Sequence, residues 1–398
     1  MFGSDSHWLT TMRTLGLPIG NKNMSCIQRI RGYAVFAAVM LFCVTAIHVG
    51  GVAHASPARN TESGSFLLYP TPPMAIRMPI RTPTPTAVGE PTPYRLTEGG
   101  CCPYPSWSPD SRWVPYLDRL GPYEPAGLYA VAASGGEVAL IVDRAGIFSR
   151  DWSRVAYADS GRTFVERWAD GERWEIPNEG RAVYFSPSGQ VIEWEVMSRG
   201  IEFPDLRQQA IWLANYDGTD AREVVTIIGG EFVGWVNGEG EILVTGRLAP
   251  YGPAGIWKIK LEDGAGQLML EMDRVRSPLL SLGGDWLAFT VAFDTEEERN
   301  GLWVMRTDGS FSKKLDMFGA YRWRREGELL VIPLDLEQPG PTLWQLDVIS
   351  GESWRLIDPM NISLRIASND WQPAPDGEKI VFRSAEDQNL WVLELPVP

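Results

Sequence analysis

The sequence predicts an all-β chain folded as a seven-bladed β-propeller, with four antiparallel strands in each blade. Two repeats that run in register along the chain support this fold class, and no segment shows a long amphipathic helix. Two offset repeats with hairpin-type turns favour a propeller over a sandwich. Six blades is the main alternative, because the repeat at residues 146–177 is short.

The first repeat places a large apolar residue directly before a tight turn, as in "PSWSPDSRW", residues 105–113. Pro-Asp-Ser is turn chemistry, because Pro presets φ and Asp can bond its own backbone two residues on. An alternating apolar strand follows each turn. The repeated positions, spaced 41, 37, 50, 45, 43 and 48 residues apart, are Trp107, Phe148, Phe185, Trp235, Leu280, Trp323 and Trp371.

The second repeat is an apolar–aromatic–apolar segment that mostly ends in a glycine turn. Its aromatic position is held by Tyr129, Trp212, Trp257, Trp303, Trp344 and Trp391, with Phe164 the nearest match in the short repeat. We expect the aromatic residues of both repeats to be structural and those before the turns to pack between blades. Each contributes about 2–3 kcal/mol of burial.

The ring requires a closing strand. The last repeat ends at "NLWVLELPVP", residues 389–398, with no fourth strand after it, whereas "YRLTEGG", residues 94–100, precedes the first repeat. We therefore expect this N-terminal strand to complete the last blade. Such closure removes the exposed sheet edges that invite aggregation.

Three parts of the chain differ in composition. Residues 1–55 contain an apolar run, Tyr33–Val52, flanked by Arg29 and Arg31 and followed by small residues that suit signal cleavage. This part is a signal peptide or an uncleaved membrane anchor that tethers the chain. Residues 56–93 are a Pro/Thr-rich linker, and residues 94–398 form the propeller. Either reading places the propeller outside the cytoplasm: secreted, periplasmic or anchored at the cell surface.

The charge and the histidines limit the possible functions. A net charge of −14 argues against nucleic acid and anionic lipid as partners. The histidines are His7, His48 and His54, all within residues 1–55, so we expect neither Ser-His-Asp catalysis nor His-ligated zinc in the propeller. We expect no metal and no cofactor. Paired carboxylates remain possible as catalysts, but the sequence does not select a pair.

Two turns carry a family resemblance. "WSPDS" (107–111) and "PAPDG" (373–377) resemble the WD-repeat-like Pro-Asp motif of TolB-type propellers, which also occurs in the propeller domains of prolyl-oligopeptidase-type peptidases. The resemblance covers about residues 94–395 and includes no hydrolase domain. It implies a scaffold and binding module that is often associated with the cell envelope.

The loops between second and third strands vary most in length and share one face, where recognition is expected. Tyr123 and Tyr251 lie in Pro-flanked loops and are candidate contacts. A further candidate is the acidic loop of Asp294, Glu296, Glu297 and Glu298. The alternative is that these side chains are simply exposed to solvent and bind nothing. We expect an exported, non-catalytic propeller that binds a protein or glycan partner through this face. The alternatives are a carboxylate-based polysaccharide-active enzyme and the sensory ectodomain of an anchored protein.

Cys101 and Cys102 are adjacent and are the only cysteines after residue 55. In an oxidising compartment they can form a vicinal disulfide that stiffens the connection into the first blade or contacts a ligand. Two free thiols or an intermolecular bridge are the other possibilities.

We predict that Cys101 and Cys102 are bonded to each other in the exported protein. Thiol titration and non-reducing mass spectrometry should find no free thiol and a monomer. Because the ring is small, reduction should barely change the melting temperature (Tm). Two titratable thiols, or a dimer that reductant dissolves, would contradict this prediction.

Overall fold

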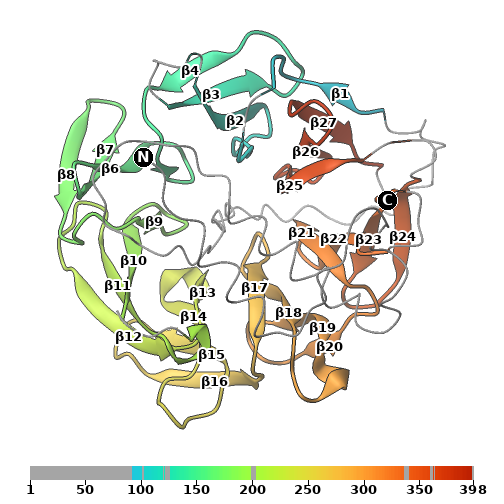
Figure 1. The fold of residues 1–398 in the computed structure, drawn as a ribbon. Helices are drawn as coiled ribbons and strands as arrows, with labels where there is room; N and C mark the ends of the chain where they lie inside the picture. Colours follow the sequence, from blue (N-terminus) through green and yellow to red (C-terminus); the bar gives the residue numbers. More distant parts are fainter. Residues whose placement is uncertain are drawn as a thin grey trace, which may run out of the picture. The chain divides into compact units, whose positions relative to one another are not determined.

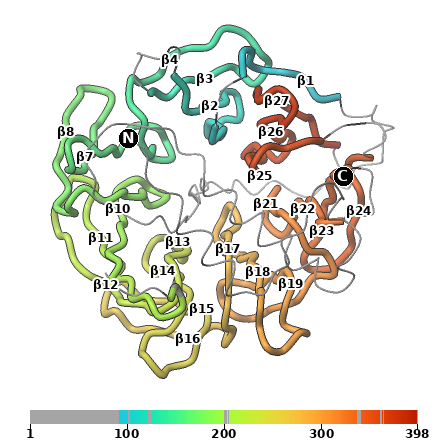
Figure 2. Tube along the Cα trace, in the orientation of Figure 1, coloured from blue at the N-terminus to red at the C-terminus, as the bar shows by residue number. Residues whose placement is uncertain are grey.

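The structure is a computed structural model that describes residues 92–396 except 101–102, 120, 122–125, 199–202, 336–339, 359–361 and 363. Its strands form seven antiparallel sheets that follow one another around a ring (Figure 1), and the chain path in Figure 2 runs around the ring once. The prediction of a seven-bladed all-β propeller is confirmed, and the six-bladed alternative is wrong.

Each blade runs from an inner strand to an outer strand. Blades 1 to 3 contain β2 (Trp113–Asp118), β3 (Gly127–Ala132), β4 (Ala139–Val142), β5 (Ile147–Phe148), β6 (Arg154–Asp159), β7 (Arg162–Arg167), β8 (Glu172–Ile176), β9 (Tyr184–Phe185), β10 (Val191–Met197), β11 (Gln208–Asn215) and β12 (Arg222–Ile228). Blades 4 and 5 contain β13 (Phe232–Val236), β14 (Glu241–Gly246), β15 (Gly255–Lys260), β16 (Gly266–Glu271), β17 (Val275–Leu280), β18 (Trp286–Val291), β19 (Gly301–Arg306) and β20 (Ser312–Lys314).

Blade 6 contains β21 (Gly319–Arg325), β22 (Glu328–Pro333), β23 (Leu343–Asp347) and β24 (Ser353–Ile357). Blade 7 contains β25 (Ile366–Pro373), β26 (Lys379–Ser384), β27 (Leu390–Glu394) and β1 (Tyr94–Arg95). Three short 3-10 helices lie in connections: η1 (Pro204–Leu206), η2 (Asn237–Glu239) and η3 (Glu297–Arg299). In the described part of the chain, no helix is long and apolar enough to cross a membrane.

The inner position of blade 1 is filled by residues 103–108, which pair with β2 without forming a regular strand. The backbone N–H of Ser106 donates to Pro115 at 2.9 Å, and that of Ser108 donates to Trp113 at 2.9 Å. Blade 1 thus has the same four layers as the other blades.

The turn after the inner strand is closed by a serine. The Ser108 hydroxyl oxygen accepts the N–H of Trp113 at 2.9 Å, and the N–H of Ser111 donates to the Ser108 carbonyl. Ser149, Ser186 and Ser281 form the same pair of contacts in blades 2, 3 and 5. This turn explains the Ser that follows the large apolar residue in the first repeat.

The aromatic residue before the turn packs toward the preceding blade. The indole N–H of Trp107 donates to the carbonyl of Gln372 in blade 7 at 2.9 Å, and that of Trp323 donates to Leu279 in blade 5 at 2.8 Å. Trp235 and Phe185 are buried in the same way. Clusters of buried apolar side chains therefore lie between neighbouring blades.

Blade 7 departs from the predicted register. Ala374 begins its turn as Ser108 begins that of blade 1, so Pro373 holds the position equivalent to Trp107. Trp371 lies two residues earlier, on the same face of the strand, and is fully buried among residues of blades 6 and 7. In "DWQPAPDG" the aromatic residue therefore lies two positions further from the turn than in the other repeats. Because side chains alternate between the two faces of a strand, a shift of two residues keeps it in the core.

The aromatic of the second repeat lies on the third strand of every blade, opposite an apolar residue of the second strand. The pairs are Tyr116–Tyr129, Tyr157–Phe164, Trp194–Trp212, Val244–Trp257, Phe289–Trp303, Val331–Trp344 and Phe382–Trp391. Such cross-strand pairs stabilise a sheet. Phe164 occupies the position in blade 2, which makes blade 2 a complete repeat.

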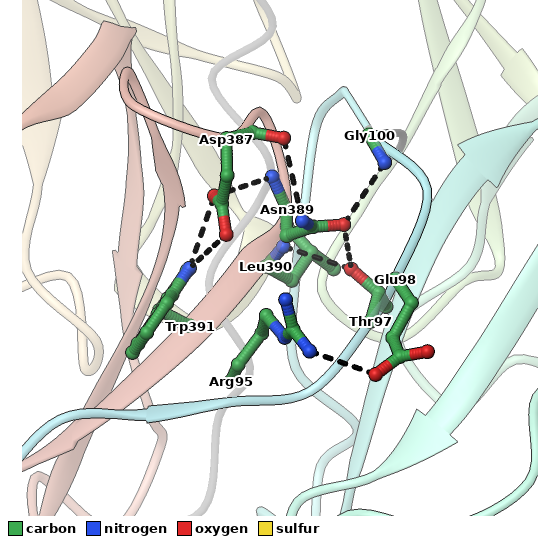
Figure 3. A network of polar contacts seen from close by, with 8 residues as sticks. All are labelled: Arg95, Thr97, Glu98, Gly100, Asp387, Asn389, Leu390 and Trp391. Carbon is green, nitrogen blue, oxygen red and sulfur yellow. Dashed lines mark hydrogen bonds and ion pairs between the residues drawn. The ribbon is translucent and has the colours of Figure 1, made fainter.

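The ring closes through β1, as the sequence predicted. Tyr94 and Arg95 pair with Val392 and Trp391 of β27. Beyond the strand, the hydroxyl oxygen of Thr97 accepts the N–H of Leu390 at 2.9 Å, and the side-chain oxygen of Asn389 accepts the N–H of Gly100 at 3.0 Å (Figure 3).

The closing segment also joins blade 7 to blade 1. Leu96 is buried in the cluster that contains residues of both blades, and the Tyr94 hydroxyl donates to the Ala133 carbonyl at 2.8 Å. The signal peptide or anchor and nearly all of the linker fall at residues 1–91, outside the described residues, as do Cys101 and Cys102. Those assignments stay predictions.

Removing the closing segment should destabilise the ring. A variant that begins at residue 100 loses the burial of Leu96, worth about 2 kcal/mol, and several hydrogen bonds worth about 1 kcal/mol each. We expect its Tm to fall by about 10 °C relative to a variant that begins at residue 92. Calorimetry of the two variants tests this, and equal Tm values would contradict it.

Candidate functional site

The candidate site lies where the inner strands begin, on the face of the ring that carries the loops between second and third strands. In an antiparallel blade the start of the first strand lies beside the end of the second. Three glutamates meet there between blades 3 and 4: Glu193 and Glu195 of β10, and Glu231 just before β13. We call Glu193, Glu195 and Glu231 the carboxyl cluster.

Side chains alternate between the two faces of β10, so those of Glu193 and Glu195 both point toward blade 4. Glu193 and Glu195 pair with Leu213 and Ile211 of β11, which pack against the inner strands of blade 4. The Glu193 side chain has no exposed surface, and neither of its carboxyl oxygens has a hydrogen-bond partner within residues 92–396 as described. A buried carboxyl without a partner is costly and unusual in a core.

Two glycines bring Glu231 to the same place. A Cβ on Gly230 would lie 1.9 Å from the Thr245 carbonyl oxygen, and one on Gly229, whose φ is +65°, would lie 2.4 Å from that of Asp205. The backbone N–H of Glu231 donates to the Thr245 hydroxyl at 3.0 Å. The sequence Gly-Gly-Glu therefore lets the chain pass close to β14 and the η1 loop and fixes Glu231 at the start of β13.

Burial raises the pKa of all three carboxyl groups. Burial raises the pKa of Glu231 to about 7, the negative charge of Glu195 adds to the shift, and Arg276 opposes it. Burial also raises the pKa of Glu195, which the Phe232 N–H and the Gln209 side chain partly offset. The pKa of Glu193 lies well above its usual range because of burial and the nearby Glu195. Burial thus favours the protonated form of each of these carboxyl groups.

A second group of charges lies on the inner strands of blades 6 and 7. Burial raises the pKa of Asp370 to about 6, although the Tyr104 N–H, Arg383 and Arg322 all stabilise its charged form. An Arg383 guanidinium nitrogen lies 3.4 Å from the Asp370 carboxylate. Arg322 lies over the Trp371 ring, with 5.3 Å from guanidinium carbon to ring centroid.

Tyr321 of β21 connects the two groups. Its hydroxyl donates to the Ser277 carbonyl of β17, and both Glu231 and Arg322 affect its pKa, which burial raises. Arg276 of β17 faces Glu231 and forms an ion pair with Asp205 of η1 at 3.0 Å. Ionisable groups of blades 3 to 7 thus interact along the inner rim, and Asp205 links the loop of blade 3 to blade 5.

The predicted contact residues lie in loops on the same face. Tyr251 is fully exposed in the loop between β14 and β15. Asp294, Glu296, Glu297 and Glu298 lie in the loop before β19, where the Asp294 carboxylate accepts the Glu296 N–H at 2.9 Å and Glu296 pairs with Arg299 at 3.0 Å. That loop is organised by its own contacts. Tyr123 lies outside the described residues.

The sequence reasoning missed the carboxyl cluster and Asp370. One signal was present: "VIEWEVM", residues 191–197, places two glutamates on one face of a strand whose other residues are apolar. Where both faces of a strand are covered, such charges are exceptional. "GGEFVGW", residues 229–235, carried a weaker signal, a carboxyl directly before an inner strand.

No group of three histidine, cysteine, aspartate or glutamate side chains in the described segments has the arrangement of a metal site. Exposed apolar residues of the loops and strand ends on this face include Met197, Phe203, Leu206, Tyr251, Phe293 and Leu334. A few polar groups within an apolar and aromatic surface are typical of a small-molecule or glycan site.

The known structures with a similar fold include two of oligogalacturonate lyase. One, in complex with manganese, is 10% identical and has a TM-score of 0.55 over 78% of this chain and 99% of that one. The other, from Vibrio parahaemolyticus, is 9% identical with a TM-score of 0.58 over 76% and 93%. TolB from Acinetobacter baumannii is 11% identical with a TM-score of 0.40 over 71% and 64%. No protein-family model and no curated protein matches the sequence.

These comparisons correct the predicted function. We expected a non-catalytic module, in part because the resemblance to TolB-type propellers implied a scaffold. Oligogalacturonate lyase, which is named as an enzyme, has the same fold across nearly its whole chain. Because an enzyme has this fold, the prediction of a non-catalytic propeller is wrong where it rests on the fold. At identities near 10%, the similarity to these structures shows the fold alone.

Stability should fall with rising pH because of Glu231. In the folded chain the Glu231 carboxyl keeps its proton up to about pH 7, whereas in the unfolded chain it loses the proton near its usual pKa of 4.5. The folded state thus binds more protons between these values, so the free energy of unfolding falls as pH rises. We expect Glu231→Gln to be more stable than wild type above pH 7, by up to about 3 kcal/mol, with the gap closing near pH 4.5.

Urea unfolding of the two proteins from pH 4.5 to 8 measures this gap. Glu262→Gln, which removes an exposed carboxyl from the same blade, controls for the loss of one charge. A gap that does not change with pH, or one that closes toward high pH, would contradict the account.

Proposed function

We propose that the protein is a polysaccharide-active enzyme that cleaves its substrate by acid–base chemistry at the inner rim. The observation that carries this proposal is the pKa of about 7 for Glu231, beside the Glu195 carboxyl and the Arg276 guanidinium. At neutral pH this carboxyl is present in both its protonated and its ionised form. That is the range in which a general acid or base works best.

Glu195 is the second carboxyl of the proposed pair. Two carboxyl groups that repel each other share protons, so that one is protonated while the other is ionised. Cleavage of a glycosidic bond requires this state: the acid protonates the leaving oxygen and the carboxylate activates water or attacks the sugar. Glu193 has no exposed surface, so it does not meet substrate, and the charge of Glu195 adds to the rise in its pKa.

The same groups also suit elimination from a uronate sugar. In that reaction a base removes the proton next to the sugar carboxylate, the bond to the glycosidic oxygen breaks as the acid protonates that oxygen, and a carbon–carbon double bond forms. Arg276, which is paired with Asp205 and whose charge lowers the pKa of Glu231, would neutralise the sugar carboxylate. The name of oligogalacturonate lyase adds a reason to include uronate polymers among the substrates.

We further propose that this activity operates outside the cytoplasm. Arg29 and Arg31 before the apolar run Tyr33–Val52 support export. The turns "WSPDS" and "PAPDG" support a relationship to the Pro-Asp repeat of TolB-type propellers. Polysaccharide of a cell envelope or of the surroundings is the substrate such a location offers.

Incubation of the full chain with uronate-containing and neutral polysaccharides tests the proposal. New reducing ends report cleavage of either kind, and ultraviolet absorbance of an unsaturated uronate separates elimination from hydrolysis. We expect Glu231→Gln to lower the rate by about 100-fold or more, because acid–base groups contribute that much. Glu262→Gln should cleave as wild type does. Failure to cleave any polymer, or full activity of Glu231→Gln, would contradict the proposal.

A further inference from the structure

A cavity lies on the opposite face of the ring, among the turns that follow the inner strands of blades 1 to 3. Pro109, Arg150, Asp151 and Pro187 line it, and its volume is about 440 Å³. Pro109, Arg150 and Pro187 hold the same position in three successive turns, directly after Ser108, Ser149 and Ser186. The cavity is therefore built by equivalent residues of neighbouring repeats.

Arg150 replaces the proline that holds this position in three of the other four turns of this kind, the fourth having Leu282. Proline presets φ for such a turn, and Pro375 holds the equivalent position in blade 7. The turn of blade 2 does not depend on Arg150 for its hydrogen bonds. In this turn the backbone N–H of Trp152 donates to the Ser149 carbonyl at 2.9 Å, and the Ser149 hydroxyl donates to the Asp151 carboxylate at 2.7 Å. An arginine here contributes nothing to the turn that a proline lacks.

The guanidinium of Arg150 lacks a protein partner. Its Nη1 atom is buried without a hydrogen bond, and it forms no ion pair, as far as the described segments extend. Burial lowers the pKa of Arg150 to about 9, and burial is the whole cause of that shift. Proteins normally pair a cation that has lost part of its hydration.

The one carboxylate in the cavity is already balanced. Asp151 accepts hydrogen bonds from the Ser149 hydroxyl at 2.7 Å and from the Ser153 N–H and hydroxyl at 3.0 and 2.8 Å. Arg154, whose guanidinium carbon lies 4.0 Å from the Tyr216 ring centroid, helps to lower the pKa of Asp151. Arg154 has the Tyr216 ring and the Ser153 hydroxyl as partners, although its Nε is buried without a hydrogen bond, whereas in the described residues Arg150 has no such contact.

We propose that this cavity binds a monocarboxylate with an apolar body, and that Arg150 is the residue that binds the carboxylate. A guanidinium forms two parallel hydrogen bonds to a carboxylate. The negative charge of Asp151 in the same cavity disfavours a dianion such as phosphate. The rings of Pro109 and Pro187 offer apolar surface on both sides of Arg150. The carboxylate is that of a small free acid or of the C-terminus of another protein, and this site is independent of the proposed activity.

Calorimetric titration of the full chain with benzoate, with benzamide and with inorganic phosphate tests the site. Wild type should bind benzoate but not its neutral amide, and should bind phosphate more weakly. Arg150→Gln should weaken benzoate binding by about 10-fold or more. Arg112→Gln, which removes an exposed arginine from the neighbouring turn, should leave it unchanged. A peptide with a free C-terminal phenylalanine and its C-terminal amide, titrated in parallel, distinguish a protein C-terminus from a small acid.

A second measurement does not depend on the choice of ligand. Because an unpaired, partly buried cation costs stability, Arg150→Gln should raise the Tm of the ligand-free chain by about 2–4 °C. A lower Tm would mean that Arg150 supports the fold and would overturn the proposal. Binding of benzoate and benzamide with equal affinity, tighter binding of phosphate, binding by Arg150→Gln at wild-type affinity, or no binding of any carboxylate would overturn it as well.

Discussion

Closure of the ring by β1 is the constraint on which the rest of the structure depends. Each blade buries its apolar faces against two neighbours, so an open ring would leave one face of blade 1 and one of blade 7 exposed. Two paired residues, the buried Leu96 and the hydroxyl of Thr97 close it. The inner strands then face one another around a centre. In that arrangement the charge of Glu231 affects Tyr321 of blade 6, and Arg322 of blade 6 affects Asp370 of blade 7.

The two faces of the ring follow different rules. On the turn face, the serine turn and its neighbours repeat from blade to blade, and most polar groups are satisfied within their own turn. On the loop face, the connections differ in length and, within the described residues, the Glu193 carboxyl is buried without a hydrogen-bond partner. Glu193 costs stability and contributes nothing to packing that a leucine would not. Retention of such residues is expected where they serve chemistry.

The fold could be predicted from the sequence because each blade repeats the same pattern of residues. The third-strand aromatics and the turns recur often enough that one weak copy, at Phe164, did not hide the pattern. Even the misaligned Trp371 stayed in the core, since a shift of two residues keeps a strand side chain on its face.

The site was harder to predict because it depends on contacts between blades. Glu195 and Glu231 are neighbours only after blades 3 and 4 have packed, and no local pattern records that distance. Loop length selected Tyr251, an exposed residue on the face that carries the candidate site, whereas the site's carboxyl groups with raised pKa lie in inner and second strands or directly before one. The available signal was the pair of glutamates in the otherwise apolar strand of residues 191–197. Their burial in the structure is what makes them candidates for a functional site.

The central claim is that packing of blades 3 and 4 turns Glu231 into a group that titrates near neutrality. An NMR titration of the side-chain carboxyl carbon of Glu231, in wild type and in Glu195→Gln, tests this claim most directly. The account predicts a midpoint near pH 7 in wild type and a lower one in Glu195→Gln, since the charge of Glu195 contributes to the shift. A wild-type midpoint near 4.5, or no change on removing Glu195, would contradict it.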